Sequence, residues 1–279
     1  MFAVKAMTRQ DFPFAVRITD QMNWGMVESD FEFMMKLEPE GCFVLFDNHE
    51  RVGIATTTSF GKIGWFGNLI VTESQRNKGA GSLLVKHSVD YLKSIGTETV
   101  GLYAYADKVD FYKRLGFEYD SEFAVLKGKG FSSQKREGTV HVTGKDMQKI
   151  IDYDSLCFGA SRSKVLGPIM ADSSNVGYIC VDKNRMRGYA LAKVYDGIAD
   201  VGPLVSQKGR SDLAINLLKA VLDRLKDARV SLCLPKKDKP LLNMLEANGF
   251  VESFPLMRMF LNPRPMSECV YVAESLERG

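Results

Sequence analysis

One short stretch of the sequence combines residue types that suit a phosphate group. The hexamer 76–81 (RNKGAG) follows the apolar run 65–71 and precedes a segment with helical periodicity. The N-terminus of a helix presents unpaired backbone N–H groups and a positive potential, and glycine lets an anion approach them closely. Arg76 and Lys78 add positive charge suited to a pyrophosphate. The order strand, glycine-containing loop, helix therefore predicts a phosphate-binding loop.

Two better-known phosphate loops fit this stretch less well. A dinucleotide-binding fingerprint needs a third glycine where Leu84 stands, and a Walker loop needs a Gly-Lys-Ser/Thr ending that the chain lacks here. The histidines His49 and His87 have no nucleophile beside them, and the cysteines show no catalytic pairing. The chemistry of this region is therefore expected to depend on the loop itself.

The elements that must position this loop alternate between strand and helix patterns. The stretch Thr8 onward is expected to be helical, and Ser29 with Glu32 three residues later predicts a capping box for a second helix. Alternating or apolar runs predict strands at 2–7, 42–46, 52–60, 64–71, 99–104 and 117–126, and helical spacing predicts helices around 85–92 and over 108–115. This pattern predicts an α/β domain with mixed strand order.

The second half of the chain repeats the first. The stretch from Gly67 (GNLIVTESQRNKGAGSLL) aligns with the stretch from Gly202 (GPLVSQKGRSDLAINLL), and a second Gly-Phe anchor follows in each half. From Gly67 to Gly116 is 49 residues, and from Gly202 to Gly249 is 47. Two matched anchors at matched spacing predict an internal duplication.

The duplication suggests two domains joined by a polar linker. The stretch 128–139 is rich in glycine, serine and charged residues and has no periodicity, so we expect domains at 1–127 and 140–279. In the second domain Asp212 and Leu213 stand where the loop would need glycines, and an aspartate there repels a phosphate. We therefore expect the second domain to be degenerate.

Two segments of the first half resemble the signatures of the GNAT acyltransferase superfamily. LIVTESQRNKGAGSLL is similar to its strand-to-helix segment with the RxxGxG motif, and FYKRLGFEYDS is similar to its second signature. The resemblance covers residues 1–126, and MNWGMVESDFEF and YDSLCFGASRS resemble a two-domain subgroup with a degenerate second domain. It implies an α/β (α+β) fold of tandem GNAT-like domains, each with a central mixed, mostly antiparallel twisted sheet flanked by helices.

The resemblance also implies acetyl-coenzyme A as co-substrate and a set of residues to hold it. In the superfamily a bulged strand leaves a gap that the pantetheine arm completes, and a backbone N–H there forms an oxyanion hole. Carried over to this sequence, the residues implied in cofactor binding are Leu69, Ile70, Val71, Gln75, Arg76, Asn77, Lys78, Gly79, Ala80, Gly81 and Ser82.

For catalysis the resemblance implies Tyr112 as the acid that protonates the departing thiolate. The aligned residue of the second half, Leu245, cannot do this. Many members carry a glutamate base on the bulged strand, but the run 64–71 contains none. Glu28, Asp30, Asp107 or a chain of waters are the alternatives for the base.

The expected activity is transfer of an acetyl group to a primary amine within a ternary complex. Trp24, Phe60 and Trp65 are candidates to shape the acceptor pocket with the second domain as cover, and Arg162 is a candidate to bind an acceptor carboxylate. The acceptor could be a small molecule or a protein amine. The alternative functions are a non-catalytic acyl-coenzyme A sensor or a structural module.

The composition and charge of the chain limit which partners and which cellular location we expect. A net charge of +3 without a long basic run argues against nucleic acid as a partner, and no apolar run approaches the roughly 20 residues that span a bilayer. Five dispersed cysteines without metal-ligand spacing predict reduced core thiols, no metal and a cytoplasmic protein. A tandem of domains can imitate the dimer of single-domain members, which favours a monomer.

Overall fold

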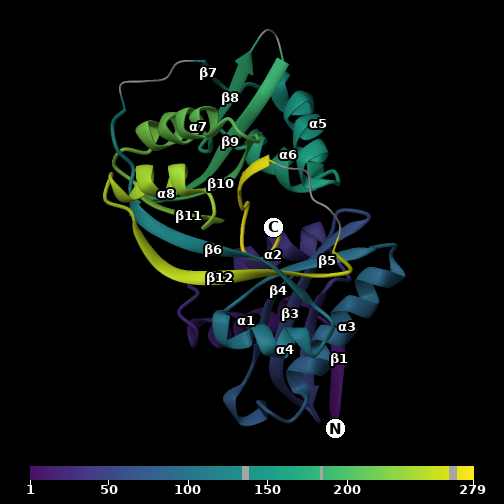
Figure 1. The fold of residues 1–279 in the computed structure, drawn as a ribbon. Helices are drawn as coiled ribbons and strands as arrows, with labels where there is room; N and C mark the ends of the chain where they lie inside the picture. The colour runs from purple at the N-terminus through teal and green to yellow at the C-terminus, as the bar shows by residue number, and fades with distance from the viewer. Residues whose placement is uncertain (134–137, 183–184, 264–268) are drawn as a thin grey trace.

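The first half of the chain folds as a sheet with helices on both of its faces (Figure 1). The computed structural model describes residues 1–133, 138–182, 185–263 and 269–279. The elements of this half are β1 (Phe2–Ala6), α1 (Phe12–Asp20), α2 (Glu28–Leu37), β2 (Cys42–Asp47), β3 (Glu50–Ser59), β4 (Ile63–Val71), α3 (Ala80–Ser94), β5 (Thr99–Ala104), α4 (Val109–Lys113) and β6 (Glu118–Lys129).

The second half repeats this order of elements. They are β7 (Thr139–His141), α5 (Met147–Phe158), α6 (Ser163–Ala171), β8 (Val176–Asp182), β9 (Arg185–Tyr195), β10 (Ile198–Gln207), α7 (Ser211–Arg224), β11 (Arg229–Pro235), α8 (Lys239–Glu246), β12 (Val251–Leu261) and β13 (Cys269–Val272). The predicted linker is shorter in the structure, because its two ends lie in β6 and β7. Residues 134–137 of that linker lie outside the described residues.

The two halves exchange their long strands. Within the described residues one sheet runs in the order β1-β2-β3-β4-β5-β12-β6-β11-β10-β9-β8-β7, with β13 added beside β10. Thus β12 of the second half pairs with β5 of the first, whereas β6 pairs with β11, and the two exchanged strands lie side by side between the halves (Figure 1). The predicted fold class is confirmed: a mixed, mostly antiparallel sheet is flanked by helices.

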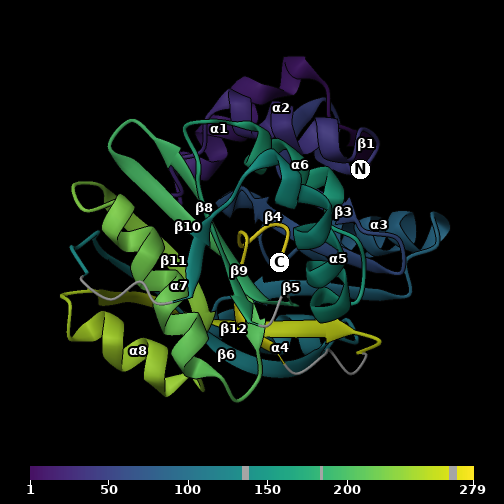
Figure 2. The same ribbon diagram turned by 90° about the horizontal axis from the view of Figure 1, so that it is seen from above.

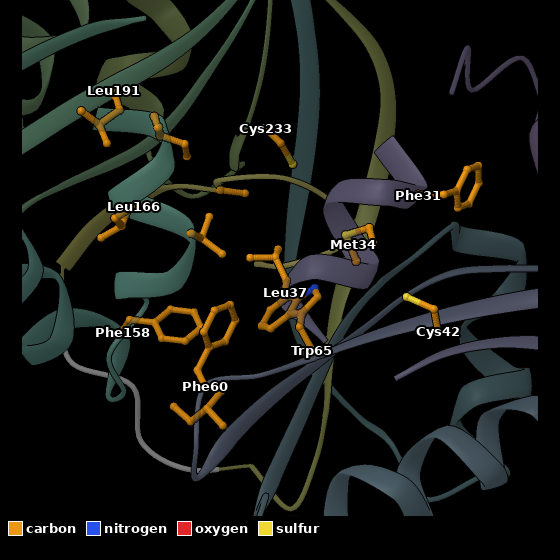
Figure 3. Close-up of a cluster of buried hydrophobic side chains, with 14 of the residues drawn as sticks. Phe31, Met34, Leu37, Cys42, Phe60, Trp65, Phe158, Leu166, Leu191 and Cys233 are labelled. Carbon is orange, nitrogen blue, oxygen red and sulfur yellow. The ribbon is translucent and has the colours of Figure 1, made fainter. Parts of the chain in front are cut away.

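A shared apolar core ties the halves together across this junction. Helices α1 and α2 of the first half and α5 and α6 of the second contribute to one buried cluster, which includes Met34, Trp65, Phe158 and Leu191 (Figure 3). Two separate cores lie on the opposite faces, one under α3 and α4 and one under α7 and α8. Burial of one common core therefore fixes how the two halves sit against each other.

Three sequence-based details differ in the structure. Helix α2 begins at Glu28 with Val27 as its N-cap, and the carboxylate of Asp30 accepts the Val27 N–H (2.8 Å), so the predicted capping box at Ser29 is wrong. Cys157 and Cys269 form a disulfide between α5 and β13, with Cα atoms 6.0 Å apart, instead of remaining reduced. Among the described residues, every helix is too short or too polar to cross a bilayer.

Candidate functional site

A gap opens between β4 and β5 in the first half. The two strands pair in parallel only where Ile63–Trp65 meets Thr99–Gly101. Farther along, the register of β4 against β3 shifts between Gly67 and Ile70, and Asn68 adopts a positive φ of 49°. Such a bulge bends a strand and leaves backbone groups unpaired. The rest of β4 therefore diverges from β5.

The backbone of β4 faces this gap at alternate residues. The N–H of Thr72 donates to the carbonyl of Val52 on β3 (2.8 Å), so the N–H and C=O of Val71 point to the other side, toward the gap. The backbone N–H and C=O of Leu69 also point toward the gap, whereas those of Ile70 point toward β3. The Nε of Arg76 donates to the Val71 carbonyl (3.3 Å). An extended ligand can therefore pair with β4 here if Arg76 releases this carbonyl.

The RxxGxG segment leads directly into the N-terminus of α3. Gly79 is the N-cap with φ of +83°, and the helix starts at Ala80. The first amides of the helix, from Ala80 to Ser82, precede the first intrahelical bond, in which the N–H of Leu83 donates to the Gly79 carbonyl (3.0 Å). These amides therefore have no partner within the helix, and together with the helix dipole they would favour an anion at this turn.

The loop before this helix is exposed. Arg76, Asn77 and Lys78 are solvent-accessible, and Asn77 has a positive φ of 62°. Gln75 is anchored through its side-chain amide, which donates to Asp47 (3.3 Å). A groove of about 650 Å³ runs beside the loop, lined by Gln21, Met22, Thr72, Glu73, Ser74 and Arg76. The cationic side chains are therefore accessible to a ligand from solvent, although Arg76 also holds the Val71 carbonyl.

Tyr112 lies on α4 against the α3 side of the sheet. Its ring packs on Phe66 of β4 and on Phe111 and Phe117, with ring centroids 5.0–6.5 Å apart. Burial raises the pKa of its phenol above the ordinary value, so the group is protonated at neutral pH. Its hydroxyl makes no hydrogen bond within the described residues. The phenol is therefore a free proton donor.

The three acidic candidates for the base differ in their exposure and in their partners. Glu28 is exposed at the start of α2. The carboxylate of Asp30 accepts the backbone N–H of Val27, the N-cap of α2. Asp107 forms an exposed ion pair with Lys108 (2.5 Å). Asp30 and Asp107 are therefore engaged by neighbours in their own segments, and Glu28 is exposed to solvent.

The expected acceptor residues are mostly buried. Phe60 and Trp65 both pack on Phe158 of the second half, and Trp65 is 1% exposed (Figure 3). Trp24 is partly exposed and donates its indole N–H to the hydroxyl of Tyr105 (3.1 Å). Only Trp24 of these three is therefore placed to meet a ligand without rearrangement.

Arg162 differs from the expectation of an acceptor-binding residue. It is fully buried and forms a bidentate pair with Asp154 (3.0 and 2.7 Å). It also donates to the hydroxyl of Tyr271 (2.9 Å) and to the carbonyl of Gly279 (2.8 Å). Its guanidinium is therefore used inside the protein, where it holds α5, α6, β13 and Gly279 together.

A segment that the sequence did not single out lies over β4. Residues 273–279 follow β13 and end at the centre of the molecule, between the two halves (Figures 1 and 2). A Cβ built on Gly67 would lie 2.7 Å from the Cα of Glu277, so β4 and this segment touch at that glycine. The indole N–H of Trp65 donates to the carbonyl of Leu276 (3.3 Å). No local pattern could reveal a contact between residues so far apart in the chain.

In the second half the equivalent gap is filled by the protein itself. Strands β10 and β11 pair over Ile198–Val201 and then diverge at a register shift between Val201 and Leu204. Strand β13 pairs with the freed part of β10, from Leu204 to Gln207. A Cβ on Gly202, which aligns with Gly67, would overlap the carbonyl of Ala273. At the start of α7 Arg210 is paired with Asp212 (2.7 Å).

Comparisons with known proteins agree with this architecture. Residues 6–117 match a family described as "Acetyltransferase (GNAT) family", and residues 150–271 match one described as "Acetyltransferase (GNAT) domain". No curated protein matches the chain.

Several solved structures share the fold over nearly the whole chain. A putative acetyltransferase from Pyrococcus horikoshii is 21% identical, covers 100% of this chain and 96% of its own, and gives a TM-score of 0.82. A GCN5-related N-acetyltransferase from Sphaerobacter thermophilus is 16% identical over 93% and 95% (TM-score 0.66). A tandem GNAT protein from the clavulanic acid biosynthesis pathway is 11% identical over 93% and 98% (TM-score 0.64). The chain belongs to the GNAT acetyltransferase family, with one GNAT domain in each half.

Proposed function

We propose that this protein is an N-acetyltransferase that moves an acetyl group from acetyl-coenzyme A to a primary amine by direct attack in a ternary complex. The observation that carries the proposal is the juxtaposition of the β4–β5 gap with the free N-terminus of α3. The first offers Val71 backbone groups to an extended arm, and the second offers amides and cationic side chains to phosphates.

The residues of the first domain have separate roles in this proposal. Leu69 and Val71 pair with the pantetheine arm, with Ile70 between them holding β4 on β3. Residues 75–82 hold the pyrophosphate. A backbone N–H at the bulge polarises the thioester carbonyl, and low water content strengthens that interaction. Tyr112 gives its proton to the departing thiolate, whose ordinary pKa is about 8.5 against about 10 for a phenol.

The direction of the Tyr112 shift makes thiolate protonation a cost rather than a gain. Burial raises the pKa of the phenol, so donation to a thiolate is uphill until the bound ligand changes the surroundings. An apolar site would also disfavour the thiolate anion and raise the pKa of the departing thiol, which would offset this cost.

The first test is the melting temperature with and without acetyl-coenzyme A. Ligand at 100 times its dissociation constant adds about 2.7 kcal/mol to the free energy of unfolding. The shift is expected in the parent and lost in an Arg76→Ala, Gly79→Asp double variant. The matched control is Gly96→Asp, because Gly96 also has a positive φ and open space but lies at the other end of α3.

A thiol-release assay with primary amines then separates an enzyme from a sensor. Release that depends on the amine and falls in Tyr112→Phe supports the transferase. Binding of acetyl-coenzyme A without release, across alkylamine, polyamine, aminosugar and peptide N-terminal acceptors, would favour the sensor. No melting shift at millimolar ligand would refute both.

A further inference from the structure

The proposed reaction needs a group that takes the proton of the attacking amine, and β4 does not supply one. Strand β4 (Ile63–Val71) contains no acidic residue. Side chains of a strand alternate between its faces, so Gly67 opens on the face opposite Phe66 and Tyr112. In the proposed function Tyr112 serves the departing thiolate from the Phe66 face. The Gly67 face is therefore the one left for the amine and its proton acceptor.

The segment 273–279 brings the acidic residue Glu277 to this face. Glu277 crosses β4 at Gly67, and a Cβ on that glycine would lie 2.7 Å from its Cα and 2.9 Å from its Cβ. Any other residue at position 67 would push the segment away. Gly67 is thus the position on β4 that lets the backbone of Glu277 approach so closely.

The segment is held by interactions on both sides of Glu277. The N–H of Ala273 donates to the carbonyl of Cys233 on β11 (2.9 Å), and Leu276 accepts from Trp65. Glu274 is bound by Arg278 (2.8 Å) and by Lys193 of β9 (2.7 Å). A group on a fixed segment loses little freedom when it acts on a substrate.

Glu277 differs from the other charged groups of this segment. Glu274 and Arg278 are buried and satisfy each other, whereas Glu277 is partly exposed. Within the part of the chain that the structure describes, no hydrogen bond or ion pair engages its carboxylate, although the charge of Arg278 acts nearby. Its acceptor atoms are therefore available.

We infer that Glu277 is the proton acceptor for the amine, supplied to the first domain from the end of the second. This inference rests on the proposed function. The amine nitrogen forms a bond to the thioester carbon, the C–S bond breaks, and the electron pair leaves with sulfur. Before attack, the Glu277 carboxylate takes one proton from the ammonium form of the amine, which makes the nitrogen nucleophilic. The thiolate then takes a proton from Tyr112, and the second proton of the nitrogen restores the Tyr112 phenol, while Glu277 gives its proton to solvent.

The test compares Glu277→Gln, Glu277→Asp and the parent in the full-length protein. Acetyl-coenzyme A thiol release is measured with n-propylamine, spermidine, glucosamine and a peptide with a free N-terminus. These are compared with hydroxylamine, which is unprotonated at neutral pH. Glu277→Gln should lower kcat/KM for the protonated amines by about 100- to 10,000-fold, the usual range for general base catalysis. Hydroxylamine should be affected much less, and Glu277→Asp should recover part of the loss.

A second pair of variants tests the position rather than the charge. Gly67→Ala should displace the segment and lower kcat while the melting shift with acetyl-coenzyme A is retained. Gly144→Ala, where a Cβ meets open space, is the control and should leave both unchanged.

The outcomes separate this inference from the proposed function. Equal rates of Glu277→Gln and parent with every amine would overturn the inference and leave the transferase intact. An equal loss with hydroxylamine and with the other amines would also overturn it, because a structural role would affect all nucleophiles alike. Acetyl-coenzyme A binding by the parent without thiol release would remove the transferase, and this inference with it.

Discussion

Replacing Glu274 by glutamine should destabilise the protein strongly. The Glu274 side chain is 1% exposed, and its two oxygens meet Lys193 (2.7 Å) and Arg278 (2.8 Å). Glu274→Gln leaves both cations without their buried anion. Removing one partner of a buried ion pair costs about 3–5 kcal/mol. We expect this loss in the free energy of unfolding at pH 7, measured by urea denaturation.

The loss should depend on pH in a defined direction. Burial alone would raise the pKa of Glu274, but the charges of Arg278 and then Lys193 outweigh it and lower the pKa well below its ordinary value. A depressed folded-state pKa stabilises the protein above the unfolded pKa of about 4.3 and less so below it. The difference between parent and Glu274→Gln should therefore be constant from pH 7 to 5. It should shrink by about 1.4 kcal/mol per pH unit below about pH 4.3.

The matched control lies three residues along the same segment. Glu277→Gln removes the same charge from a partly exposed group without a described partner, so its effect should stay within about 0.5 kcal/mol. If Glu274→Gln unfolded at the same urea concentration as the parent, or if the difference did not change with pH, the ion pair would not be what holds the segment.

Three further predictions concern the second half and the acid. Calorimetry should find one acetyl-coenzyme A per chain, because β13 fills the second gap; two would contradict this. Asp154→Asn should cost about 3–5 kcal/mol in urea, because it leaves buried Arg162 unpaired, whereas Asp152→Asn on the same helix is exposed and should be neutral. Tyr112→Phe should lower kcat by about 100- to 10,000-fold with an unchanged acetyl-coenzyme A dissociation constant; equal loss of affinity would point to a packing role.

Local features of the site could be predicted because they depend on neighbouring residues. The strand, loop and helix around Gly79 follow from an apolar run, glycines and helical spacing within about twenty residues. The internal repeat was visible for the same reason: each half carries its own copy of a local pattern. The misassigned cap at Ser29 shows that local patterns can also compete, because Val27 and Asp30 form an equally local alternative cap.

The sequence by itself therefore determined the fold of each half, the order of strand, glycine-containing loop and helix around Gly79, and the absence of the RxxGxG spacing from the second half, because period, glycine placement and charge act over short distances. Only the tertiary structure decided the exchange of β6 and β12, the use of Arg162 as a buried partner of Asp154, and the meeting of Glu277 with Gly67. These contacts join residues far apart in the chain. They follow from which surfaces can be buried together, and no local pattern encodes that choice.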